Sequence, residues 1–125
     1  MTPFGARLRD LRRSRGLRLK DLAAALGVSS AYLSSLEHGR RGRPSSGLVQ
    51  QISAYFTLAW DDVDELKRLA DLSHPRVVVD TAGLSPRATE LANRLAESIG
   101  SLDEKTVADI LDRLDGAGGG PKPKT

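Results

Sequence analysis

The sequence predicts an all-α protein in which a five-helix unit is followed by a C-terminal pair of helices. Large apolar side chains recur three and four residues apart over most of the chain, a spacing that places them on one face of a helix. Serine or aspartate precedes several of these segments, where it can cap a helix, and glycine follows several of them. One β-prone run, residues 76–80, is too short to form a stable sheet alone. We expect it to lie extended or to pair with its copy in a second chain.

The chain is organised around residues 17–43, which predict two short helices joined by a glycine turn. The first helix has an apolar face made by Leu19, Leu22, Ala23 and Leu26. Gly27 ends it, because glycine tolerates the left-handed backbone of a sharp turn. Ser29 can cap a second helix, from about Ser30 to His38, which turns Leu33 and Leu36 inward. Such a pair is a helix-turn-helix motif, whose second helix fits the major groove of DNA.

Three more helices complete the expected first unit. Their bounds are about Pro3–Arg15, Gly47–Phe56 and Asp61–Leu72. The last of these begins at Asp61 or Asp62, and Trp60 just before it is expected to pack in the core or against the first helical turn. Large apolar residues are frequent in the fourth helix, so this helix should close the core.

The remaining sequence predicts two amphipathic helices. Ser85 and Pro86 open a helix that runs to about Ile99, and a capping box from Ser101 to Glu104 opens another that runs to about Leu114. Two short helices cannot bury both apolar stripes against each other and stay isolated. The pair therefore either folds back on the first unit or forms a dimer interface, and we favour the dimer.

These patterns divide the chain into four parts. We expect a DNA-binding domain at 1–72, a linker at 73–84, the helical pair at 85–115 and a disordered tail at 116–125.

The charge is unevenly distributed between the two halves of the chain. The net charge is +3, but residues 1–43 contain ten Lys/Arg against three Asp/Glu, a net +7, and the rest has a net −4. A polyanion would therefore bind the part that contains the helix-turn-helix. No cysteine is present, and no apolar run approaches the length of a membrane span or a signal peptide. We expect a soluble, cytoplasmic protein.

The first half of the chain, about residues 4–72, resembles the Cro/lambda-repressor type of helix-turn-helix regulators, also called the XRE family. The residues that carry the resemblance are Leu8-Arg9-Asp10-Leu11-Arg12, Gly16-Leu17, Leu22-Ala23, Leu26-Gly27-Val28-Ser29, Tyr32-Leu33-Ser34, Leu36-Glu37 and Gly39-Arg40-Arg41. The resemblance implies a five-helix DNA-binding fold. One departure is Arg18-Leu19, where the family often has Thr-Gln, so that a glutamine contact to the DNA backbone is replaced by Arg18 or Lys20.

The resemblance also implies which side chains meet DNA. The base-reading positions fall on Ser30, Ala31, Ser34 and Ser35. The expected contacts to the DNA backbone are Arg18, Lys20, Tyr32, Arg40, Arg41 and Arg43. Serine and alanine discriminate bases poorly, so specificity would depend partly on water or on DNA shape.

The expected function is that of a sequence-specific transcriptional regulator, a homodimeric repressor that reads a palindromic operator. An alternative is the antitoxin of a toxin–antitoxin pair, in which the C-terminal helices cover the toxin and the N-terminal part represses its own operon. A third possibility is a non-specific architectural DNA binder.

Catalytic and metal chemistry find little support in the sequence. The two histidines, His38 and His74, have no metal-ligand spacing, and no cysteine or Gly-x-Ser-x-Gly elbow supplies a nucleophile. The acidic cluster at 61–65 lacks the twelve-residue pattern of a calcium loop and suits a helix start. We expect no enzyme activity, no metal and no cofactor.

Overall fold

The computed structural model describes residues 1–40 and 42–117. Within these ranges it contains seven α-helices, one short 3-10 helix and no strand, which agrees with the predicted all-α class. The chain divides into two compact units, Met1–Val77 and a second one that begins at Val78, inside the segment expected to be a linker. Arg41 and most of the expected tail lie outside the described residues.

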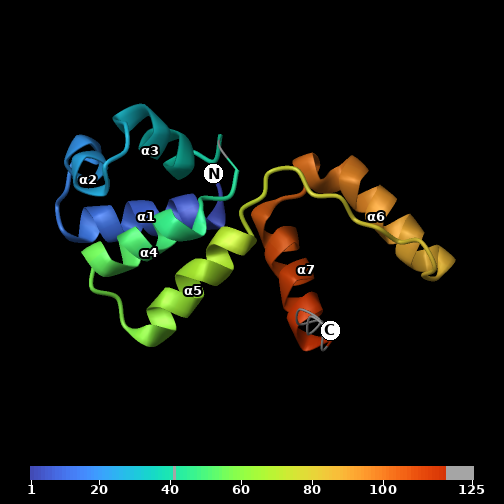
Figure 1. Ribbon diagram of the computed structural model, residues 1–125. Coiled ribbons are helices and arrows are strands. Elements are labelled where there is room, and N and C mark those ends of the chain that lie inside the picture. The colour runs from blue at the N-terminus through green and yellow to red at the C-terminus, as the bar shows by residue number, and fades with distance from the viewer. Residues whose placement is uncertain (41, 118–125) are drawn as a thin grey trace. The chain divides into compact units, whose positions relative to one another are not determined.

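The first unit is a bundle of five helices (Figure 1). Their bounds are α1 Pro3–Ser14, α2 Leu19–Leu26, α3 Ser30–Glu37, α4 Ser46–Tyr55 and α5 Trp60–Asp71. All of them contribute to one core, whose buried members are Phe4, Leu8, Leu11, Leu22, Ala23, Leu26, Leu33, Leu36, Leu48, Val49, Ile52, Phe56, Leu66 and Ala70. The apolar stripes of α1, α2 and α3 therefore face inward as their spacing predicts.

Two contacts hold α1 against the rest of the bundle. The Phe4 amide donates to the buried Ser73 hydroxyl over 2.9 Å, which ties the start of α1 to the residue that follows α5. Gly5 lies against the end of α3, where a Cβ would overlap the carbonyl oxygen of Leu36. Only glycine allows this approach, so Gly5 is needed for the packing of α1 on α3.

The turn between α2 and α3 has the predicted chemistry. Gly27 ends α2 with a left-handed backbone at φ 70°. Val28 is half-buried and packs against the core, and the Ser29 hydroxyl accepts from the Tyr32 amide over 3.1 Å. The capped turn thus fixes the angle at which α3 leaves α2.

Trp60 does not pack in the core, which corrects the expectation for this residue. It is the first residue of α5, and 87% of it is exposed to solvent. Leu58, two positions earlier, packs against the core and takes the inward position expected for Trp60. Because a residue at the first helical position points away from the bundle here, the indole is left outside.

The second unit contains α6 (Pro86–Ser98), the 3-10 helix η1 (Ile99–Ser101) and α7 (Glu104–Gly116). Its capping differs from the predicted capping box. The Asp103 carboxylate accepts from the Thr106 amide over 2.8 Å and caps α7, whereas Ser101 lies in η1 and donates to the Ser98 carbonyl. A charged acceptor directly before the helix is a stronger cap than a hydroxyl two residues further away.

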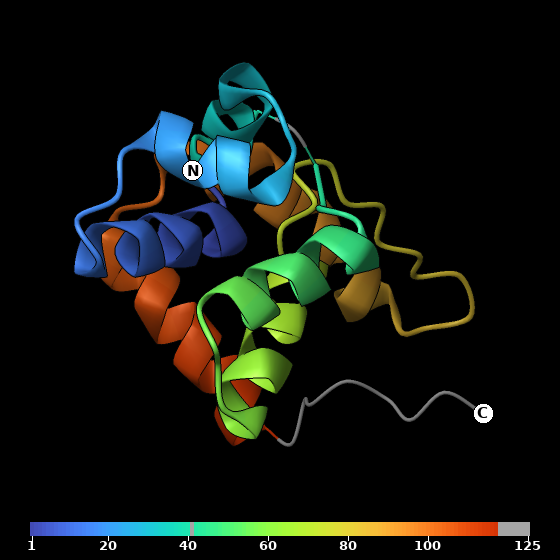
Figure 2. The same ribbon diagram turned by 60° about the vertical axis from the view of Figure 1, so that its left-hand side comes forward.

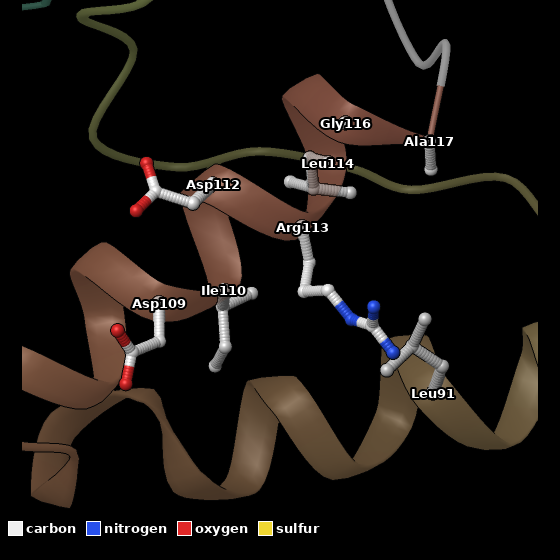
Figure 3. A pocket seen from close by; sticks show the side chains of 8 residues that line it. All are labelled: Leu91, Asp109, Ile110, Asp112, Arg113, Leu114, Gly116 and Ala117. Carbon is white, nitrogen blue, oxygen red and sulfur yellow. The ribbon is translucent and has the colours of Figure 1, made fainter.

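The described part of the second unit has no buried residue. Leu91, Leu95, Ile99, Leu111 and Leu114 are all exposed although they lie on apolar stripes. A hollow of about 990 Å³ lies between α6 and α7, with Leu91 on one side and Ile110 and Leu114 on the other (Figure 3). Residues 76–80, for which a strand was one expectation, contain no helix or strand and are exposed.

No helix in the described ranges is long and apolar enough to cross a lipid bilayer.

Candidate nucleic-acid interface

The outer side of α3 is the surface that the sequence predicts to read DNA. Ser30 and Ala31 are exposed, and Ser34 and Ser35 are half-buried, while Leu33 and Leu36 lie in the core. The four predicted base-reading residues are thus on one helix, opposite its apolar side. In Figure 2, α2 and α3 lie together at one side of the unit, with α1 below them.

The hydroxyl groups of α3 are partly engaged within the helix. The Ser35 hydroxyl donates to the Ala31 carbonyl over 2.9 Å, so it can offer only acceptor capacity to another group. His38 Nδ1 lies 2.8 Å from the Ser34 carbonyl oxygen and 3.4 Å from the Ser34 hydroxyl. No hydrogen bond of the Ser30 side chain occurs in the described structure, and its hydroxyl can therefore donate or accept.

A buried carboxylate fixes the position of α3, and sequence reasoning gave it no role. Glu37 is 2% exposed, and it accepts from Arg12 Nε over 2.8 Å and from Arg12 Nη2 over 3.0 Å. Arg9 Nε lies 3.5 Å from the same carboxylate. The hydrogen bond with Glu37 raises the pKa of Arg12 above its ordinary value, so the guanidinium stays charged.

Arg12 also connects this pair to the start of the helix-turn-helix. Its Nη1 donates to the Leu17 carbonyl over 2.9 Å, in the segment that leads into α2. One guanidinium therefore holds the entrance of α2 and the end of α3 in fixed positions. The spacing of Glu37 could have indicated this pair. Glu37 follows Leu33 by four residues and lies on the same inward side of α3, where a carboxylate needs a partner.

The residues predicted to contact the DNA backbone differ in their exposure and in whether they already form an ion pair. Lys20 and Arg40 are exposed, and neither takes part in an ion pair within the described residues. Arg18 is exposed but pairs with Asp21 over 3.2 Å, and Arg43 pairs with Asp71 over 2.6 Å. Tyr32 is half-buried and packs against the core.

The pair at the start of α2 also caps this helix. The Arg18 amide donates to the Asp21 carboxylate over 3.3 Å, and the Arg18 side chain donates to the same oxygen. The hydrogen bond from the Arg18 side chain lowers the pKa of Asp21 below its ordinary value. Arg41 lies outside the described residues, so its place beside α3 stays a prediction.

Comparison with known proteins decides the family. A family model described as "Helix-turn-helix domain" matches residues 3–69, which are more than half of the chain. The chain belongs to this helix-turn-helix family. The predicted resemblance is therefore confirmed, and the family consists of DNA-binding proteins rather than enzymes.

The chain is also similar in sequence to curated helix-turn-helix transcriptional regulators. RghRB of Bacillus subtilis, a transcriptional regulator, is 38% identical over 63 residues, which are 50% of this chain and 45% of that protein. The repressor RghR of Bacillus subtilis is 34% identical over 61 residues, which are 49% of this chain and 45% of that protein.

A mycobacterial relative extends the similarity beyond the first unit. The regulator Rv0023 of Mycobacterium tuberculosis is 52% identical in a match of length 122 that covers 88% of this chain and 47% of that protein. The first unit ends at Val77 and cannot supply 88% of the chain, so the match includes part of the second unit. The chain spans about half the length of the curated relatives it matches.

Proposed function

We propose that this chain is a DNA-binding transcriptional regulator, and more specifically a homodimeric repressor that reads a palindromic operator with α3. The observation that carries the proposal is the two-sided character of α3. Its core side is anchored by Leu33, Leu36 and the buried Glu37, and its outer side, beginning with Ser30 and Ala31, is open to solvent. A rigidly held helix with a small, polar outer side can enter a major groove.

The base-reading roles proposed for α3 follow from its hydrogen bonds. Ser30 would donate to or accept from a base edge, whereas Ser35 would accept from a donor such as the amino group of cytosine or adenine. Ala31 would contact the methyl group of thymine. Ser34 lies beside His38, and its hydroxyl would reach DNA only after turning away from that ring.

The proposed backbone contacts differ in what they must give up to bind DNA. Lys20 and Arg40 can meet phosphates without losing an ion pair in the described structure. Arg18 and Arg43 would exchange Asp21 and Asp71 for phosphate, and the net gain is smaller for such an exchange. Tyr32, through its hydroxyl, and Arg41 complete the proposed set of backbone contacts.

The exposed apolar surface of α6 and α7 supports the proposed dimer. Leu91, Ile110 and Leu114 border the hollow between the two helices, and no residue described in this unit is buried. Burial of such stripes against a second copy would remove them from water at roughly 25 cal/mol for each Å². A twofold dimer also presents two copies of α3, as the two half-sites of a palindrome require.

The functions proposed for the segments of the chain follow the domain boundaries expected from the sequence. Residues 1–72 would bind DNA, 73–84 would link, and 85–115 would dimerise, whereas most of the expected tail at 116–125 lies outside the described residues. The protein would act in the cytoplasm, where it meets chromosomal DNA. Repression would follow where the operator overlaps a promoter, and the relative RghR is itself named a repressor.

Two measurements on the full chain test this proposal together. Selection of bound duplexes from a random pool should enrich a palindrome, and the mass in solution should be that of two chains. Equal affinity for random and selected duplexes at physiological salt would instead indicate an architectural DNA binder. Copurification with a small basic protein bound to α6 and α7, in place of a second copy, would indicate an antitoxin.

A further inference from the structure

Trp60 is a large apolar side chain that the first unit leaves uncovered. It is 87% exposed at the first position of α5, and it is the only tryptophan in the sequence. The nearby Leu58 and Val63 are half-buried, and Leu58 packs against the core, so the start of α5 is held without the indole. Packing within this unit therefore does not account for a tryptophan at this position.

The indole borders a hollow in the surface of the first unit. The hollow has a volume of about 330 Å³ and is lined by Leu58, Trp60, Val63, Asp64 and Lys67. Leu58, Trp60 and Val63 supply apolar surface, and Asp64 and Lys67 supply charge at its edge. An aliphatic side chain of a partner could therefore pack against the apolar lining of this hollow.

Four carboxylates follow Trp60 within the next five positions of α5, and the hollow itself also has one cation, Lys67. Asp61 and Asp62 lie in the first turn of α5, where the helix dipole stabilises them. Asp64 and Glu65 lie beyond that turn. Within the described residues none of these four acids takes part in an ion pair, and Asp61, Asp64 and Glu65 are exposed while Asp62 is half-buried.

We propose that this corner, made of Leu58, Trp60, Val63 and Asp64, binds a protein segment that carries arginine or lysine beside an apolar side chain. A cation over the face of an indole is attracted by the ring electrons, and tryptophan is the best of the aromatic residues for this contact. Asp64 and the other acids add charge-assisted hydrogen bonds, and the aliphatic stem of the basic side chain fills the hollow. Two copies that met corner to corner would bring the same acidic surface together and be repelled, whereas a basic segment of a partner would be attracted.

The corner lies apart from the surface proposed to bind DNA. α1 packs against both α3 and α5, and α5 begins on the opposite side of α1 from α3 (Figures 1 and 2). A protein segment at Trp60 and a DNA duplex at α3 would therefore not compete for space. The corner adds a second binding surface to the proposed regulator and does not depend on its DNA target.

The single tryptophan makes the proposal directly measurable on the full chain. The probe is the peptide acetyl-Gly-Arg-Leu-Arg-Leu-Gly-amide, and the control is the same peptide with citrulline, a neutral isostere, at each arginine. We expect the arginine peptide to shift the one indole N–H resonance saturably, with at least about fivefold higher affinity than the citrulline peptide. Equal affinity of the two peptides, or no shift with either, would overturn the proposal.

Matched variants locate the binding site. Trp60→Leu should abolish binding of a fluorescently labelled arginine peptide, and Asp64→Asn with Glu65→Gln should weaken it about threefold. Asp10→Asn, which removes an exposed acid of α1, should leave it unchanged. Unaltered thermal unfolding of Trp60→Leu would show that the fold is intact. Wild-type affinity of Trp60→Leu, or an indole shift that depends on protein concentration without peptide, would contradict a basic partner at this corner.

Discussion

Glu37 at the end of α3 accepts two hydrogen bonds from Arg12 of α1, at 2.8 and 3.0 Å, in a position where the carboxylate is 2% exposed. Glu37, the only carboxylate of α3, is thus bound to α1, which lies outside the helix-turn-helix motif. Because Arg12 also donates to the Leu17 carbonyl, the orientation of α2 and α3 depends on α1. The helix-turn-helix is therefore not a self-sufficient part of this fold.

Removal of the Glu37 charge should destabilise the first unit strongly. Glu37→Gln leaves the guanidinium of Arg12 half-buried without its counter-charge, and loss of one member of a buried pair costs about 3 kcal/mol. Urea unfolding of the full chain, followed by circular dichroism, measures this difference. Asp71→Asn, which breaks the exposed pair with Arg43, is the control and should change stability by less than about 0.5 kcal/mol. Equal effects of the two substitutions would contradict a structural role for the Arg12–Glu37 pair.

Arg40→Ala should weaken binding to every DNA sequence by a similar factor. Arg40 is exposed directly after α3, and a phosphate contact adds affinity without selecting a base. The slope of log K against log salt should fall by about 1 in magnitude. Arg68→Ala on α5 removes the same charge away from α3 and should leave the slope unchanged. A loss confined to one operator base pair would show that Arg40 reads sequence.

Acid should release the cap of α7 in the second unit. The hydrogen bond from Thr106 holds the pKa of Asp103 below its ordinary value near 3.8. The carboxylate therefore stabilises the helix above the unfolded pKa, and this contribution is lost as pH falls through the lower folded pKa. The Thr106 amide resonance should titrate in this acid range. Asp103→Asn keeps a capping oxygen but has no titrating group, so its Thr106 resonance should not move.

Leu91→Glu should separate the proposed dimer. Leu91 is 66% exposed and borders the hollow between α6 and α7, so a charge there would have to be buried with the second copy. We expect the mass in solution to halve and the affinity for a palindromic operator to fall at least about tenfold, because two linked half-sites become two independent ones. Asn93→Asp on the same helix adds a charge at an exposed polar position and should remain dimeric. An unchanged mass for Leu91→Glu would place the interface elsewhere.

The local signals of the sequence account for much of the fold. Ser29 and Ser45 cap α3 and α4, and Gly27 ends α2, because the chemistry of these turns lies within a few residues. The predicted bounds of α3 and α4 differ from the structure by no more than one residue at each end. Family and fold class are confirmed by comparison and structure, whereas the DNA-contacting residues stay predictions.

Two of the three failures come from tertiary contacts that local spacing does not encode, and the third concerns which of two nearby residues caps α7. Trp60 was expected in the core or against the first helical turn, but it is exposed and Leu58 packs against the core. Ser101 was expected to cap α7, but Asp103 is the stronger acceptor and lies closer to the helix. The role of Glu37 depends on Arg12, a residue of another helix, so the tertiary fold had to be known before the pair became visible.

Entry of α3 into the major groove should protect its outer side from chemical modification. The chain has no cysteine, so Ala31→Cys places one thiol on the exposed side of α3, and Ala54→Cys places one on the exposed side of α4 as a control. The rate of alkylation by a maleimide is measured with and without a saturating selected duplex. DNA should slow alkylation at position 31 at least about tenfold and leave the rate at position 54 unchanged. An unchanged rate at position 31, with the duplex bound, would contradict entry of α3 into the groove.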